Sequence, residues 1–384
     1  MGVSELERTV ADISSESLER WFADDPSLRE IGLLRTCQRL VVLALTDGPD
    51  ADQRLSDRLG SVGRWAQRSD SEAVGHLFRV SAGLDSRAPG EREIRDQVRA
   101  AASGIRSRHP QAVLRGLLLH ASEAAAALGD RGAGSVADLA VAWLLPRLSS
   151  QSARVLVIGA GTVGRRAAER LAGRAQVTIL YRQRPPDAAW TAQWNVRACP
   201  STELIETVRA VEAVIAAAKT TGRLLGASDL PPPSPSGPRW FVDLGLPRNI
   251  DPQIGRRVGC ELVDLDGLPR GQIPSELRSE MERIVDSAAR VEARELAGAA
   301  AEPWISELRR WAETIRREEW ERAMAHAGAV SDSARLAYER LSERLVRRLL
   351  SGPTRELRAL PPGPELDLWR RRVVELFQGS DTGP

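Results

Sequence analysis

The sequence is poor in cysteine and in long apolar runs, and both shortages exclude classes of protein. The three cysteines, Cys37, Cys199 and Cys260, are too few and too far apart for a disulfide framework or a metal-ligand pattern. No apolar stretch approaches the ~20 residues that cross a bilayer. The N-terminal MGVSELERTV also lacks the apolar core of a signal peptide. We therefore expect a cytoplasmic protein with no metal site and no membrane partner.

Lysine is almost absent. Lys219 is the only lysine, so nearly all of the 54 basic side chains are arginines. Together with abundant alanine, this bias is typical of a GC-rich genome, and we do not interpret it as selection for nucleic-acid contacts. The formal net charge of +2 is too small for a strong basic field over the whole molecule, and we expect no DNA partner. Arginine-rich surfaces can still bind phosphates locally.

The pattern of apolar residues predicts a multi-domain α/β protein. The length of 384 residues is enough for two or three domains. We predict an α+β domain over 1–148, a doubly wound α/β domain of the Rossmann type over 149–272, and an all-α region over 273–384. The all-α region would be a long connecting helix followed by an oligomerisation module. The alternative is an intramolecular bundle, but one extended helix buries little of its own apolar stripe.

Within these domains the periodicity predicts the individual elements. The predicted strands lie at 31–45 (with an interruption), 155–158, 177–181, 211–217 and 241–244. The predicted helices lie within 1–30, at 70–80, 91–107, 111–148 (broken near 129–134), 162–172, 274–327 and 334–350, the last ending at SGP.

The stretch VIGAGTVG contains a glycine motif that binds dinucleotides. Gly159, Gly161 and Gly164 have G-x-G-x-x-G spacing, directly after a buried strand and at the start of a helix. The first permits a tight turn, the second lets the backbone approach a pyrophosphate, and the third lets helix and strand pack closely. Thr162 and Val163 would offer helix N-terminal amides to the anion. The alternative is a glycine-rich turn without a ligand.

The end of the next strand indicates which nicotinamide is used. An NAD site usually has Asp or Glu there for the ribose hydroxyls. This chain has Tyr181-Arg182-Gln183-Arg184 and no acid. Arg182 or Arg184 would hold a 2′-phosphate, which favours NADPH over NADH. Alternatively, both arginines are simply solvated.

The stretch RTCQR, residues 35–39, places a thiol between two cations. A lone cysteine near apolar strands is usually core filler. In an extended segment, however, Arg35 and Arg39 would share a face with Cys37 and lower the pKa of its thiol. A nucleophilic thiol and a reduced nicotinamide together indicate attack on an activated acyl carbon, followed by reduction of the thioester to an aldehyde. Cys199 and Cys260 have no such setting, and we interpret both as structural.

Several segments, taken in order, resemble the glutamyl-tRNA reductase family. They are TCQR (36–39), AVGHLFRVSAGLDSRAPGEREIRDQVRAA (73–101), RGAGSV (131–136), VIGAGTVG, FVDLGLPRNIDP (241–252) and SGPTRELR (351–358). Order and spacing agree over nearly the whole chain. The resemblance implies a catalytic domain, an NADPH domain, a long spinal helix and a helical dimerisation domain that forms a homodimer.

The resemblance also implies a reaction and roles for residues. Cys37 would attack the ester of glutamyl-tRNA, and NADPH would reduce the thioester to glutamate-1-semialdehyde for tetrapyrrole synthesis or a specialised pathway. His76 would assist proton transfer, unless it is a structural histidine. Arg39 would hold the substrate carboxylate, and Thr36 and Ser86 would line the pocket. A downstream aminotransferase would be a further partner.

The sequence departs from the family around the expected pocket. The family's opening Asn-His-Lys-Thr-x-Pro strand has no counterpart here, so either the true start lies upstream or part of the pocket has been lost. Gln38 replaces the usual Asn, Arg35 replaces a small residue, and Arg87-Ala88-Pro89 replaces an apolar tripeptide. Two alternatives therefore stay open: a reductase of another aminoacyl-tRNA or carrier-bound acyl group in specialised metabolism, and a non-catalytic dimeric binding or regulatory protein.

Overall fold

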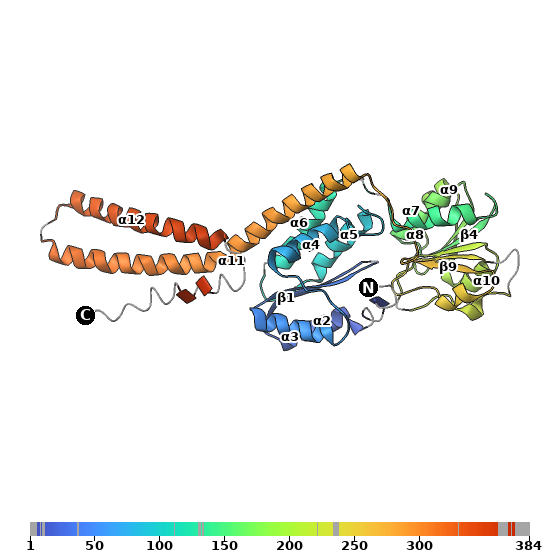
Figure 1. The fold of residues 1–384 in the computed structure, drawn as a ribbon, viewed down its shortest axis with the longest axis horizontal. Helices are drawn as coiled ribbons and strands as arrows, with labels where there is room; N and C mark the ends of the chain where they lie inside the picture. Colours follow the sequence, from blue (N-terminus) through green and yellow to red (C-terminus); the bar gives the residue numbers. More distant parts are fainter. Residues whose placement is uncertain are drawn as a thin grey trace. The chain divides into compact units, whose positions relative to one another are not determined.

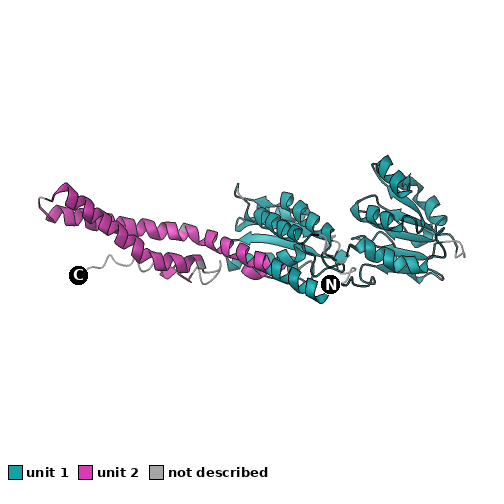
Figure 2. Ribbon diagram, turned by 90° about the horizontal axis from the view of Figure 1, so that it is seen from above, with its two compact units in different colours: residues 1–67, 77–286 teal, residues 68–76, 287–384 magenta. Residues whose placement is uncertain are grey.

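The computed structural model describes residues 6, 7, 9, 12–36, 38–110, 112–129, 132, 134–220, 222–232, 238–328, 330–359, 368, 369, 371 and 372. Two compact units make up the chain, and Figure 2 colours them separately. The first consists of residues 1–67 and 77–286, and the second of residues 68–76 and 287–384. Within the described residues, none of the helices is both long enough and apolar enough to cross a membrane.

The N-terminal part of the first unit is built on a three-stranded antiparallel sheet in the order β2-β1-β3 (Figure 1). Helices cover both of its faces, with α2 and α3 on one side and α5 and α6 on the other. The strands are β1 (Leu28–Arg35), β2 (Leu40–Thr46) and β3 (Arg106–Ser107). The helices are α2 (Ser15–Asp24), α3 (Pro49–Gly60), α5 (Arg92–Ala101) and α6 (Val113–Ala127).

A buried carboxylate ties β1 to α6. Glu30 lies in β1 and is only 1% exposed. It accepts hydrogen bonds from the backbone N–H groups of Val113 and Leu114, each at 2.8 Å. These are the first amides of α6, which have no partner inside the helix. A negative charge at this end of a helix is also favourable, so Glu30 fixes where α6 begins.

The C-terminal part of the first unit is the predicted doubly wound domain. Its six parallel strands have the order β6-β5-β4-β7-β8-β9. The strands are β4 (Arg154–Ile158), β5 (Gln176–Tyr181), β6 (Arg197–Pro200), β7 (Ala213–Ala216), β8 (Trp240–Asp243) and β9 (Glu261–Asp264). The helices are α7 (Val136–Leu144), α8 (Thr162–Leu171), α9 (Ala188–Trp194) and α10 (Leu204–Arg209). The strand order reverses between β4 and β7, and ligands of such sheets bind where the order reverses.

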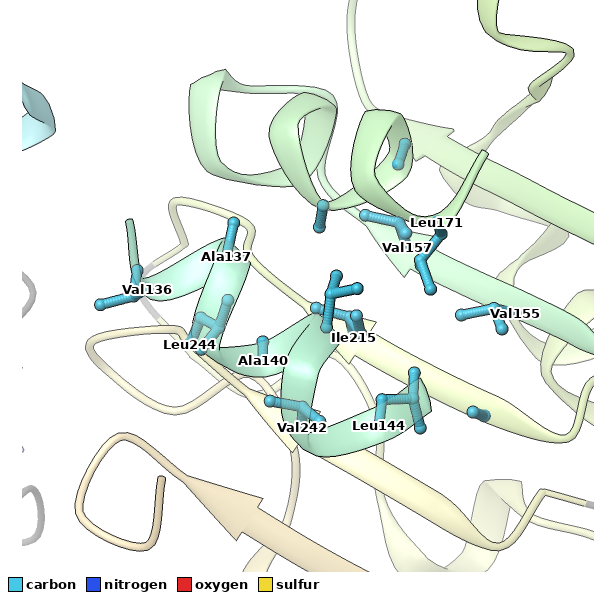
Figure 3. Close-up of a cluster of buried hydrophobic side chains, with 14 of the residues drawn as sticks. Val136, Ala137, Ala140, Leu144, Val155, Val157, Leu171, Ile215, Val242 and Leu244 are labelled. Atoms are coloured by element: carbon cyan, nitrogen blue, oxygen red, sulfur yellow. The ribbon is translucent and has the colours of Figure 1, made fainter. Parts of the chain in front are cut away.

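Both faces of this sheet are buried, which explains its uninterrupted apolar strands. Figure 3 shows Val155, Val157 and Ile215 of the strands against Ala140 and Leu144 of α7. A second cluster covers the opposite face and includes Phe241, Val208 of α10 and Ile254. Since the interior residues of the central strands meet packed side chains on both faces of the sheet, no alternation of polar and apolar residues is required.

Two long helices dominate the second unit. α11 (Ser275–His326) has 52 residues and continues from the first unit into the second. α12 (Asp332–Ala359) follows it. The side chains of Ala301, Ile305 and Leu308 on α11 pack with Leu357 on α12. A further helix, α4 (Asp70–Ser81), contributes its first residues to this unit.

The predicted fold class is confirmed, but several element assignments were wrong or incomplete. The helix predicted over 91–107 ends at Ala101, because Arg106–Ser107 pairs with β1 as β3. The helix predicted over 334–350 continues through Pro353 to Ala359. Proline removes one backbone donor, but the helix goes on, and Leu357 beyond it is packed in the core with α11. The short edge strands β6 and β9 were not predicted at all.

Candidate active site

Thr36, Gln38 and Arg39 lie in the turn that joins the antiparallel strands β1 and β2. The backbone N–H of Thr36 donates to Arg39 O at 2.9 Å. The Thr36 hydroxyl oxygen accepts from the backbone N–H groups of Gln38 (3.3 Å) and Arg39 (3.0 Å). Thr36 is 4% exposed, so its hydroxyl closes the turn from the buried side. Cys37 belongs to this stretch of sequence but lies outside the described residues.

The two arginines that flank Cys37 in the sequence each have a partner within the fold. Arg35 Nη2 donates to Ile13 O at 3.0 Å, and Arg39 Nη2 donates to Asp85 O at 2.8 Å. Because Cys37 lies outside the described residues, its shared face with the two arginines and the lowered pKa of its thiol stay predictions.

The loop after α4 contacts the turn between β1 and β2. Ser86 is buried, and its hydroxyl donates to Ala88 O. The Asp85 carboxylate lies 3.3 Å from Arg79 Nη2 and 4.0 Å from Arg39 Nη1. The structure thus places Thr36, Arg39 and Ser86 in one neighbourhood. Sequence reasoning missed Asp85, because nothing in the sequence shows that a residue 46 positions away would meet Arg39.

His76 lies on α4 and is partly buried. It belongs to the second compact unit, whereas the turn belongs to the first. Its role beside the thiol stays a prediction.

The glycine turn has the geometry that a dinucleotide requires. Gly159 has a φ of +108°, and a Cβ there would lie 2.9 Å from Ala217 O. A Cβ on Gly164 would lie only 1.8 Å from Gly159 O. The helix and the turn can therefore pack this closely only because residue 164 has no side chain. A Cβ on Gly161 would meet no atom within 4 Å. The first two glycines are therefore required by the protein's own packing, whereas Gly161 borders open space where a phosphate can approach.

The start of α8 leaves its first amides for a ligand. Gly161 is the N-cap residue and supplies no side-chain hydrogen bond. Thr162 is exposed and Val163 partly exposed in the first turn that follows. Sequence reasoning missed Arg165, whose Nε donates to Ala160 O at 3.0 Å and whose guanidinium carbon lies 5.3 Å from the centre of the Trp190 ring. These residues fit a pyrophosphate at a helix N-terminus.

Arg182 and Arg184 follow directly after β5, the strand beside β4. Both are exposed. The carboxyl end of this strand is where the adenosine ribose lies in a Rossmann-type site.

In the part of the chain that the structure describes, no three His, Cys, Asp or Glu side chains gather closely enough to bind a metal ion.

A cavity of about 580 Å³ lies apart from these residues. None of the predicted site residues lines it. Its charged lining side chains are Arg92, Glu93, Asp138, Arg166, Arg170 and Arg174. Asp138 is paired with Arg166 at 2.7 Å and with Arg170 at 2.6 Å.

Glu91, beside this region, is a buried carboxyl that is 2% exposed. Its Oε2 has no hydrogen-bond partner among the described residues. Burial, together with the nearby charge of Glu93, raises its pKa from 4.5 to about 8. Between pH 4.5 and about 8 the folded protein keeps a proton on Glu91 that the unfolded chain releases. The contribution of the protonated Glu91 to stability is therefore lost as the pH rises towards 8.

We predict that Glu91→Gln removes this pH dependence. A neutral amide of the same size has no proton to lose, so the variant should gain stability relative to the native protein between pH 5 and pH 8, by about 4 kcal/mol at most. Urea unfolding at several pH values measures the difference. Glu123→Gln, which changes an exposed side chain on α6, is the matched control. Its free energy of unfolding should depend on pH in the same way as that of the native protein. If the Glu91 variant also kept the native pH dependence, Glu91 would not be the titrating group.

Three family models match the chain, one after another. Residues 2–130 match the N-terminal domain of glutamyl-tRNAGlu reductase. Residues 132–270 match the shikimate/quinate 5-dehydrogenase model, which indicates a nicotinamide-binding domain. Residues 280–378 match the dimerisation domain of glutamyl-tRNAGlu reductase.

Full-length relatives agree with these matches. A glutamyl-tRNA reductase of Caldivirga maquilingensis is 31% identical over 344 residues, which cover 84% of this chain and 81% of the relative. One from Kineococcus radiotolerans is 28% identical over 388 residues, which cover 94% and 87%. Among solved structures, glutamyl-tRNA reductase from Methanopyrus kandleri aligns over 100% of this chain and 96% of its own, with 22% identity and a TM-score of 0.47.

Proposed function

The chain belongs to the glutamyl-tRNA reductase family, and from this premise we propose that it reduces glutamyl-tRNA to glutamate-1-semialdehyde through a thioester at Cys37. The observation that carries the proposal is the presence in one compact unit of the Thr36-closed turn and a glycine turn shaped for a dinucleotide.

The chemistry divides into two steps. The Cys37 thiolate attacks the ester carbonyl carbon, the C–O bond to the tRNA 3′ end breaks, and a proton passes to the leaving hydroxyl, for which we propose His76 as the donor. Bound NADPH supplies the hydride that converts the thioester to the aldehyde. A proton is then needed at Cys37 sulfur as the thiol departs.

We propose that Arg39 recognises the side-chain carboxylate of glutamate. A planar guanidinium carries five N–H donors in a fork that matches a carboxylate. The Arg39 side chain is 29% exposed, so a ligand can reach it. Its bond to Asp85 O fixes its direction. Ser86, on the same loop as Asp85, would line the pocket with Thr36.

The test of the function is NADPH oxidation by the purified protein with individually charged tRNAs. Oxidation with glutamyl-tRNA, together with release of glutamate-1-semialdehyde, is the expected result. Oxidation with a different charged tRNA would establish a re-specified reductase. If NADPH bound but no charged tRNA supported its oxidation, the protein would act on another carrier or would not be an enzyme.

We propose NADPH rather than NADH because Arg182 and Arg184 stand where a 2′-phosphate would lie. A charge-assisted hydrogen bond to phosphate contributes roughly 1.5–3 kcal/mol. Replacing either arginine with alanine should therefore raise the Kd for NADPH by about ten- to a hundredfold and leave NADH binding unchanged. Fluorescence titration measures both. Arg197→Ala, at a side chain that is 75% exposed on β6, is the matched control. Equal weakening of both nucleotides would contradict the assignment.

We propose that the protein is a homodimer formed through its C-terminal helices. Tyr338, Leu341, Leu345 and Leu349 on α12 are all exposed, and Leu349 is 73% exposed. Their spacing of three and four residues places them on one face of the helix. A second copy would cover this stripe, in agreement with the dimerisation-domain match over 280–378. Sedimentation of the native protein tests this proposal, and a monomer at micromolar concentration would overturn it.

A further inference from the structure

Arg87 makes an unusual set of contacts with residues 266–271, the segment that follows β9. Its Nη1 donates to Leu268 O at 2.6 Å and its Nη2 to Asp266 O at 2.7 Å. Its own carbonyl oxygen accepts from the backbone N–H of Gly271 at 2.7 Å. The side chain is only 19% exposed. Both ends of a rigid guanidinium fork are thus used on main-chain oxygens.

The 266–271 segment is fixed to the nucleotide domain. Leu268 is 2% exposed and belongs to the core between the sheet and α7. The Asp264 carboxylate, at the end of β9, accepts from the backbone N–H groups of Asp266 (3.0 Å) and Gly267 (3.2 Å). Arg248 holds the same carboxylate at 2.7 Å. Arg87 therefore binds a segment that is itself fixed to the nucleotide domain by core packing and hydrogen bonds.

On its other side Arg87 contacts the thiol turn. Its backbone N–H donates to Gln38 Oε1 at 3.2 Å, and the backbone N–H of Gln38 donates to the Thr36 hydroxyl that closes the turn. Gln38 Nε2 is fully buried and has no partner among the described residues. Burying an amide N–H without an acceptor is unfavourable. Among the described residues, the side-chain hydrogen bond of Gln38 is the one that its Oε1 accepts from Arg87.

We propose that Gln38 and Arg87 are positioning residues that hold the Cys37 turn against the nucleotide domain through a continuous series of hydrogen bonds. The series runs from the Thr36 hydroxyl through Gln38 and Arg87 to the 266–271 segment. It fixes where the thiol stands relative to the domain that brings the hydride, and so it rests on the proposed function.

The experiment measures the alkylation rate of Cys37 by iodoacetamide in the full-length protein, with the modified peptide identified by mass spectrometry. It needs no tRNA and no turnover. Arg87→Leu removes both guanidinium bonds to the 266–271 segment and leaves only the backbone bond to Gly271, and Gln38→Leu cuts the link at the turn. Each should change the alkylation rate about threefold or more. Because both cut one series, the double variant should differ no more than the larger single change.

Two controls separate the link from general damage to the fold. Arg106→Leu removes an arginine that pairs with Glu19 inside the N-terminal part, and it should leave the alkylation rate unchanged. NADPH binding should be retained in every variant. An unchanged rate in Arg87→Leu, or additive effects in the double variant, would overturn the link. Failure of the native protein to bind NADPH or to reduce glutamyl-tRNA would instead overturn the proposed function. The alkylation rates do not depend on turnover, so they would still test the link in that case.

Discussion

Replacing Cys37 with serine is expected to abolish NADPH oxidation with glutamyl-tRNA, by about a thousandfold or more. A hydroxyl is far less ionised and far less nucleophilic than a thiol at neutral pH, so no acyl-enzyme forms. The nucleotide site is separate in sequence, and NADPH binding should be unchanged. Acid quenching of the native protein with glutamyl-tRNA, before NADPH is added, should reveal a glutamyl adduct on the Cys37 peptide that the variant lacks.

The other two cysteines are matched controls. Cys199 is 2% exposed, and its Sγ lies 3.3 Å from Glu203 Oε2. Burial raises the pKa of both Cys199 and Cys260 above the ordinary thiol value. Neither is poised as a nucleophile, so Cys199→Ser and Cys260→Ser should keep most of the activity. Turnover by Cys37→Ser within tenfold of the native rate would contradict the thioester mechanism.

The second large effect is expected from one methyl group at Gly164. A Cβ there would lie 1.8 Å from Gly159 O and 3.0 Å from Gly159 C, and both are backbone atoms that cannot rotate away. Gly164→Ala must therefore push α8 away from the turn. We expect a loss of roughly 2–3 kcal/mol in stability from this overpacking, and NADPH binding weakened at least about a hundredfold because the N-terminus of α8 is displaced.

Gly161→Ala is the matched control for that experiment. Its Cβ would meet no protein atom within 4 Å, and its φ of −78° suits any residue. The melting temperature should stay close to native, while NADPH binding weakens because the methyl group faces the approaching pyrophosphate. Thermal melts and fluorescence titration of the two variants separate packing from ligand contact. A Gly164→Ala protein with native stability and native NADPH affinity would show that the turn can relax, and it would contradict this prediction.

Local sequence patterns predicted the elements that have strong local signals. The strands β4 and β5 and the helix α8 follow from an apolar run, a glycine turn and a helical period within about thirty residues. The hairpin at RTCQR was anticipated only as two strands with an interruption. The turn itself depends on the Thr36 hydroxyl, which accepts two backbone N–H groups, and short polar turns of this kind have weak composition signals.

The errors lie where tertiary contacts outweigh local preference. Arg106–Ser107 is a strand only because β1 offers an edge to pair with, and Pro353 is tolerated only because α12 is held by its contacts beyond it. The edge strands β6 and β9 are four residues each, too short for a period to be recognised.

The sequence by itself determined the family, the order of the folded parts, the nucleotide motif and the candidate nucleophile. Each depends on residue types at short spacing, which the chain carries wherever it folds. Only the tertiary structure decided that Arg39 meets Asp85 and that Arg87 joins the thiol turn to the 266–271 segment. Arg87 and Leu268 are 181 positions apart. Such contacts arise from how two packed cores are connected, and no local pattern of side chains encodes them.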